Sequence, residues 1–310
     1  MNQIASQNHE PLATHIPVLL NEVLTFLDPQ PGQIIVDATV GGGGHAAAIA
    51  TRIGAKGQFI AIEQDSTMLR LAQNRLALIP DKPICNWFHD NFAHLPALLE
   101  QSHVSLADGV FADLGFASDQ VADPTRGLSF QSDGPLDMRL GEQGWDTAAD
   151  LIQTLPEREL ANIFFHYGEE RFSRRIARRI VQQRDVQPIT TTKELANVVR
   201  QCIPGVGKSR IDPATRVFQA LRIAVNRELE NLDALLHCLP TILKPGGRVV
   251  IISFHSLEDR MVKRAFKETP GWNVLTKKPI MASEQEVASN PRSRSAKLRA
   301  ATLMPSERRF

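Results

Sequence analysis

The sequence predicts an α/β protein in which an open, mainly parallel sheet is interrupted by an inserted helical domain. Short apolar runs alternate with helical patterns as far as Asp113, and such alternation is typical of parallel sheets. The stretch Thr147–Cys202 has helical patterns only. Strand-like runs resume at Arg248. We therefore expect a sheet domain at residues 1–140 and 205–310, with a helical insert at residues 141–204.

The composition is that of a globular protein, with 43% hydrophobic and 22% charged residues. A net charge of +1 argues against a protein that coats nucleic acid indiscriminately, although it allows local basic patches. No apolar run approaches the roughly 18 residues of a membrane span, so we expect no membrane partner. Three widely spaced cysteines form neither a disulfide framework nor a zinc pattern, which favours a cytoplasmic protein without a metal: Cys85, Cys202 and Cys238.

The first strand and helix are joined by four glycines, Gly41–Gly44. Ile34–Val36 is a β-branched apolar run of the kind that is buried on both faces of a sheet. A helical run, Ala46–Ile53, follows the glycines. Nucleotides bind at such turns because glycine lets a ligand approach the backbone and the start of a helix offers free N–H groups.

The acids at the ends of the first two strands favour S-adenosylmethionine (AdoMet) over a dinucleotide. Gly41, Gly43 and Ala46 match a dinucleotide pattern with Glu63 as the ribose acid, but a run of glycines matches such patterns easily. A dinucleotide needs no carboxylate where Asp37 ends the first strand, whereas AdoMet carries a cationic amino-acid end. Asp37 would hold that end, directly or through water, and Glu63 the ribose. The alternative is that both acids cap turns.

The third and fourth strands bring further side chains to the same edge. Ile84–Phe88 leads to Phe92, which would stack on an adenine or be an ordinary core aromatic. Ala107–Asp113 ends on another carboxylate. Because ligands of parallel sheets sit beyond the carboxyl ends of the strands, Asp113 is expected beside Asp37 and Glu63.

The helical region carries basic side chains that we expect to contact RNA phosphates. Four arginines share one face of the helix predicted over Glu169–Arg184, and no acid follows Glu170 to balance them. A second predicted helix, Asp212–Leu229, has a polar stripe that includes two more arginines. The alternative is a plain solvated surface. The candidate RNA-binding residues are Arg171, Arg174, Arg175, Arg178, Arg216 and Arg222.

Eight sequence motifs resemble those of the bacterial ribosomal RNA small subunit methyltransferase H family, in the expected order from about Thr14 to Leu303. They are His15–Leu20, Asp37–His45, Asp113–Gly115, Arg126–Phe130, Asp133–Arg139, Tyr167–Phe172, Thr215–Arg222 and Ile252–Arg260. The resemblance implies a class I, Rossmann-like AdoMet-dependent methyltransferase fold with a helical insert. It also implies methylation of a cytosine N4 in the decoding region of 16S rRNA, within the small ribosomal subunit.

The resemblance also implies cofactor contacts at Gly43, Gly44, His45, Glu63, Phe92, Asp113 and Gln120. Two positions depart from the family pattern. Glu63 stands where an aspartate is usual, and its carboxylate can still hold a ribose. The Asp-Leu-Gly motif continues as Phe116-Ala117-Ser118, where a small residue and a serine are more usual in the family, which excludes a hydroxyl role at Ala117.

The chemistry requires an acceptor for the amine N–H, since the lone pair of a cytosine amine is delocalised into the ring. Asp113 is the candidate acceptor, with positioning of AdoMet as its rival role. Phe116 would stack on the flipped base, and His255 is a second candidate contact. Two other classes stay open: an amine methyltransferase acting on DNA or a small molecule, and a non-catalytic RNA-binding assembly factor. The sequence does not indicate an oligomeric state.

Overall fold

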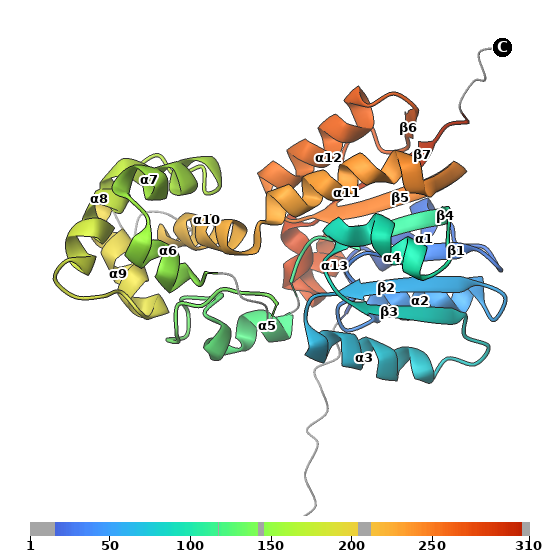
Figure 1. The fold of residues 1–310 in the computed structure, drawn as a ribbon, viewed down its shortest axis with the longest axis horizontal. Coiled ribbons are helices and arrows are strands. Elements are labelled where there is room, and N and C mark those ends of the chain that lie inside the picture. The colour runs from blue at the N-terminus through green and yellow to red at the C-terminus, as the bar shows by residue number, and fades with distance from the viewer. Residues whose placement is uncertain (1–15, 117, 142–145, 204–211, 306–310) are drawn as a thin grey trace, which may run out of the picture.

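A computed structural model describes residues 16–116, 118–141, 146–203 and 212–305. His15, which begins one of the motifs, and Ala117 lie outside the described residues. The chain forms two lobes, one built on the sheet and one made of helices (Figure 1). Within the described ranges, no helix is both long and apolar enough to cross a membrane.

The sheet has seven strands in the order β3-β2-β1-β4-β5-β7-β6. Strands β1 to β5 are parallel, and β7 runs antiparallel to both of its neighbours. The α/β class with a parallel, Rossmann-like sheet is thereby confirmed. The strands are β1 (Ile34–Asp37), β2 (Gln58–Glu63), β3 (Ile84–His89), β4 (Ala107–Asp113), β5 (Leu243–Ser253), β6 (Trp272–Val274) and β7 (Lys297–Leu303).

Helices cover both faces of the sheet and create two apolar cores. Successive residues of β1 point to opposite faces, so that Ile35 packs in one core and Val36 in the other. This two-sided burial explains why the strands read as continuous apolar runs. The helices of this lobe are α1 (Leu20–Leu27), α2 (Gly44–Ile53), α3 (Ser66–Ala77), α4 (Leu95–Gln101), α5 (Ser118–Ala122), α11 (Glu228–Ile242), α12 (Ser256–Glu268) and α13 (Glu284–Ser289).

The second lobe has a core of its own, which runs from Leu136 to Val225. It therefore includes residues on both sides of the 141–204 segment that the sequence suggested, and we propose 136–225 as the extent of the lobe. Its helices are α6 (Ala148–Thr154), α7 (Glu157–His166), α8 (Ser173–Arg184), α9 (Thr192–Cys202) and α10 (Ala214–Asn226).

A sharp break separates α10 from α11, where the sequence had predicted one helix to Leu229. Arg227 adopts a left-handed conformation with φ of 50°, and α11 starts at the next residue. The Asn226 side chain, just before the break, donates to Met138 O at 2.8 Å and accepts from Leu140 N at 2.8 Å. The break thus anchors the loop that leads into the helical lobe.

Candidate functional site

A pocket lies at the carboxyl edge of the sheet, where the helical lobe joins it. The ends of β1, β2 and β4 form one side, and the α10–α11 break contributes Asn226, Glu228 and Asn231 to the other. The structure brings seven of the predicted site residues to its wall: Gly44, His45, Glu63, Phe92, Asp113, Phe116 and Gln120.

Gly43 does not line this pocket, although it belongs to the glycine turn. It has φ of 78°, and a Cβ atom there would lie 2.8 Å from the Cα of Ala72 in α3. A glycine is required because the turn packs directly on the backbone of that helix. The need for glycine at this position is therefore explained by packing and not by a ligand contact.

Asp37 lies behind the pocket wall and not on it. The side chain is completely buried, Oδ1 accepts from Thr39 N at 3.1 Å, and Oδ2 has no hydrogen-bond partner among the described residues. Burial, assisted by the nearby Asp113 and Glu63, raises the pKa of Asp37 to about 8. Asp37 is not among the residues that line the pocket, so of the two contacts that the sequence allowed, direct or through water, the structure does not provide the direct one.

Glu63 fastens the glycine turn to the end of β2. Its Oε2 accepts from Gly41 N at 2.9 Å, and its Oε1 accepts from Asp65 N at 3.0 Å. Burial raises the pKa of Glu63, and the backbone N–H groups of Asp65, Gly41 and Gln64 oppose that rise. A carboxylate has about four lone-pair positions, so capacity remains for a donor that enters the pocket.

His45 and Asp113 form a second polar group on the wall. His45 Nε2 lies 2.8 Å from the carbonyl oxygen of Val18, so this nitrogen carries the proton. Burial lowers the pKa of His45 to about 4, which leaves the ring neutral. Its Nδ1 is then an acceptor, and it lies 3.8 Å from Asp113 Oδ2. Two acceptors at this separation are arranged to receive a shared donor such as an ammonium group.

Gln120 and Phe92 both line the pocket. Gln120 is 6% exposed, and its amide donates to Asp65 Oδ2 at 3.0 Å. The same oxygen receives Arg126 from the loop that leads to the helical lobe. Asp65 also caps α3 by accepting from the backbone of Thr67 and Met68, so it holds three elements together.

Phe116, which also lines the pocket, belongs to a network of charged side chains. The Arg222 guanidinium lies 4.3 Å from the centre of the Phe116 ring. Arg222 also makes two hydrogen bonds to Glu228, of 2.6 and 2.8 Å. The Arg222 side chain is only 15% exposed and is held by an acid and an aromatic ring. The structure therefore does not present Arg222 to RNA, in contrast to the expectation from the sequence.

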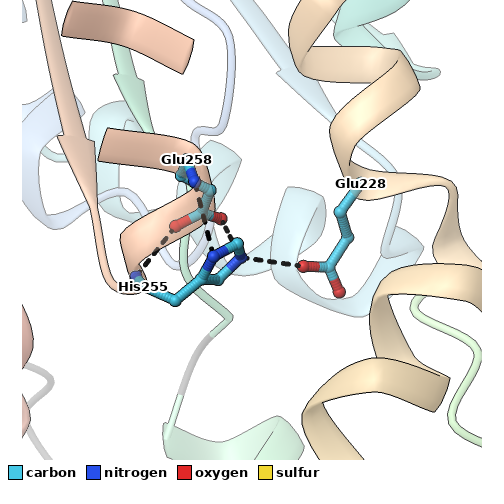
Figure 2. A group of neighbouring side chains, drawn as sticks. All are labelled: Glu228, His255 and Glu258. Atoms are coloured by element: carbon cyan, nitrogen blue, oxygen red, sulfur yellow. Dashed lines mark hydrogen bonds and ion pairs between the residues drawn. The ribbon is translucent and has the colours of Figure 1, made fainter. Parts of the chain in front are cut away.

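Figure 2 shows the other half of the network, in which His255 lies between Glu228 and Glu258. His255 Nε2 is 3.1 Å from Glu258 Oε1 and 3.8 Å from Glu228 Oε2. Burial lowers the pKa of His255, but the two carboxylates outweigh it and raise it to about 9. His255 does not line the pocket, whereas both glutamates do. Sequence reasoning missed both glutamates, since Glu228 approaches His255 only through the fold.

These three side chains offer ligand atoms within 4.8 Å of one another, as a metal site would. Two positive groups already balance the two carboxylates, namely Arg222 and the protonated His255. A cation would therefore have to displace an existing ion pair. The arrangement is better suited to holding the Phe116 side of the pocket rigid.

The candidate RNA-binding arginines of α8 are exposed on the helical lobe. Arg171, Arg174 and Arg175 make no side-chain hydrogen bond or ion pair with any residue that the structure describes. Arg178 is 67% exposed and lies 3.5 Å from Glu157. Arg216, on α10, is 51% exposed and donates to the carbonyl of Glu169 at 3.4 Å. The α8 arginines thus form a positive surface, and Arg216 contacts Glu169 in the segment between α7 and α8.

Comparison with known proteins identifies relatives along almost the whole chain. The model of the MraW methylase family matches residues 12–304. The "Ribosomal RNA small subunit methyltransferase H" of Synechococcus sp. (strain JA-2-3B'a(2-13)) is 50% identical, over 93% of this chain and 91% of its own. The protein of that name from Sorangium cellulosum is 47% identical, over 93% and 90%. Among solved structures, a putative rRNA-methylase from Clostridium thermocellum has a TM-score of 0.44 and 11% identity, over 92% and 95% of the two chains.

Proposed function

The chain belongs to the MraW methylase family, and we propose that it methylates the N4 amine of a cytidine in the decoding region of 16S rRNA. It is an AdoMet-dependent methyltransferase, and its relatives bear the name of a ribosomal RNA small subunit methyltransferase. We propose the small ribosomal subunit as its partner and the cytoplasm as its compartment. The observation that carries the proposal is the pocket, whose wall combines the acceptors of Glu63, His45 and Asp113 with the aromatic ring of Phe116.

The residues present fit AdoMet. We assign the ribose hydroxyls to Glu63, whose carboxylate lines the pocket and has acceptor capacity beyond its backbone bonds. The amino-acid end suits His45 Nδ1 and Asp113, which are two acceptors 3.8 Å apart. Phe92, on the wall beside Asp90, is suited to the adenine. When bound, the cofactor supplies an electrophilic methyl group.

The part of Asp113 in the chemistry is to accept an N–H of the target amine. That hydrogen bond draws the lone pair out of the ring conjugation and directs it toward the methyl group. The base must leave its stack to enter the pocket. Phe116 is the ring on which it would stack, and Arg222 already covers one of the two faces of that ring. His255 does not contact the base in this proposal, but it positions Glu228 and Glu258, which line the pocket.

Asp113→Asn tests the proposal, with AdoMet affinity and single-turnover methylation measured on the same preparation. We expect AdoMet binding to weaken, because the charge that faces its ammonium group is removed, and we also expect a large loss of rate that persists at saturating AdoMet. A loss that recovers at saturating AdoMet would instead assign Asp113 to cofactor positioning alone. Wild-type protein offered small ribosomal subunits, naked RNA and DNA would identify the substrate class. Transfer to DNA alone, or AdoMet binding without transfer, would refute the proposed function.

A further inference from the structure

The corner between α7 and α8 exposes two aromatic rings. Phe165 is 55% exposed in the last turn of α7, and Phe172 is 37% exposed at the N-cap of α8. No other phenylalanine in the described ranges is exposed. A folded chain normally buries such side chains, so two at one corner indicate a surface that binds something.

The corner holds these rings on a rigid frame. Glu170 N donates to Phe164 O at 3.1 Å, and the Glu170 carboxylate accepts from Phe172 N at 2.8 Å. A Cβ atom at Gly168 would lie 2.5 Å from the carbonyl oxygen of Arg216, so the corner packs closely on α10. Exposure of the rings is therefore a property of the folded lobe, not of a loose loop.

Exposed arginines flank Phe172 on both sides along the chain. Arg171 precedes Phe172 directly, and Arg174 and Arg175 follow it in the first turn of α8. These arginines are exposed and have no side-chain partner among the described residues. Exposed aromatic rings interleaved with cations are the features that bind single-stranded nucleic acid, because bases stack on the rings while phosphates meet the charges.

The corner is also tied to the methyltransferase pocket. Glu169 lies 3.0 Å from Arg260 Nη2 and accepts a hydrogen bond of 3.0 Å from Ser256 Oγ. Ser256 is the first residue of α12, and Phe254 and Glu258 on either side of it line the pocket. A strand that delivers a base to the pocket therefore has this corner beside its path.

We propose that the α7–α8 corner is a stacking platform for unpaired bases of the RNA strand that flanks the target nucleotide, with Phe165 and Phe172 as the stacking rings. The inference rests on the proposed function and adds the form of the substrate, which is single-stranded at this point. A duplex would meet the arginines but has no free base faces to offer the rings.

The test uses the full chain and three RNA probes of one length: a single strand, the same strand with abasic sites, and a duplex. Phe165→Leu/Phe172→Leu keeps apolar side chains and removes the rings. We expect it to weaken binding of the intact single strand by about tenfold or more. Binding of the abasic strand and of the duplex should stay the same. Val186→Ala, at an 85% exposed apolar position, is the matched control and should change none of the three.

Equal weakening for all three probes would overturn the platform, since the rings would then stabilise the fold or the positions of the arginines and would not stack on bases. An unchanged affinity for the intact strand would overturn it as well, and so would an absence of single-strand binding by the wild type. AdoMet affinity of the leucine variant, measured by calorimetry, reports that the fold is retained. Methyl transfer by the wild type tests the proposed function separately, because it does not depend on how the leucine variant binds RNA.

Discussion

Asp37→Asn should change how the stability of the protein depends on pH. The pKa of this buried carboxyl is raised from 3.8 to about 8, chiefly by burial. Between these values the unfolded chain has lost the proton and the folded chain retains it, so folding takes up a proton. The contribution of Asp37 to the free energy of unfolding therefore falls as the pH rises through this window.

The size of the effect follows from the shift. Each pH unit within the window costs about 1.4 kcal/mol, so the wild type should lose about 3–4 kcal/mol relative to the variant between about pH 5 and pH 8. Asparagine keeps an acceptor for the Thr39 amide, now bonded to Asp37 at 3.1 Å. It adds a buried NH₂ group without a partner, a cost of about 1–3 kcal/mol that does not vary with pH. The difference in slope is thus the quantity to measure.

Urea unfolding of both proteins at several values between about pH 5 and pH 8 measures this slope, because the other titrating groups are common to both. Asp81→Asn, at an exposed position, serves as the control for removing one carboxyl. If the wild-type and Asp37→Asn curves run parallel, Asp37 is ionised in the folded protein and the reasoning from burial is refuted.

Three further changes test other parts of the structure. Glu63→Ala should weaken AdoMet binding by roughly tenfold or more, since it removes charged hydrogen bonds of about 1.5–3 kcal/mol each; unchanged affinity by calorimetry would assign the ribose elsewhere. His255, with its pKa raised to about 9, contributes stability below about pH 6.5 that is lost as the pH rises through about 9. His255→Gln should therefore remove up to about 3 kcal/mol at pH 6 and little above pH 9, and an equal loss at both values in urea unfolding would contradict this. Arg174, Arg175 and Arg178 changed together to Gln should lower the salt dependence of RNA binding by about 0.7 slope unit per lost phosphate contact; an unchanged slope would remove these arginines from the RNA surface.

The strands and the edge that carries the site were predictable because they depend on local patterns. Apolar runs ending on Asp37, Glu63 and Asp113 correspond to β1, β2 and β4, and parallel strands bring their ends together. How deeply each of these carboxylates is buried was not predictable. Asp37 is sealed by neighbouring strands, whereas Asp113 reaches the wall, and neither outcome is visible in the residues beside them.

Long-range pairing accounts for the remaining differences. The stripe that contains Arg222 has the same spacing whether it faces a phosphate or a buried acid, and its partner Glu228 lies beyond a break in the helix. That break occurs at Arg227 without the glycine or proline that would have indicated it. The network around His255 thus depends on a turn with no sequence signal.

The two connections between the sheet lobe and the helical lobe both contribute residues to the pocket. The chain leaves the sheet after β4, and Phe116 stands at the exit; it returns at the α10–α11 break, and Glu228 stands at the entrance. Glu63 and His45 belong instead to the sheet lobe. Arg222 of the helical lobe contacts both of these connections, through the ring of Phe116 and the carboxylate of Glu228, so the two crossings of the chain are joined at the pocket.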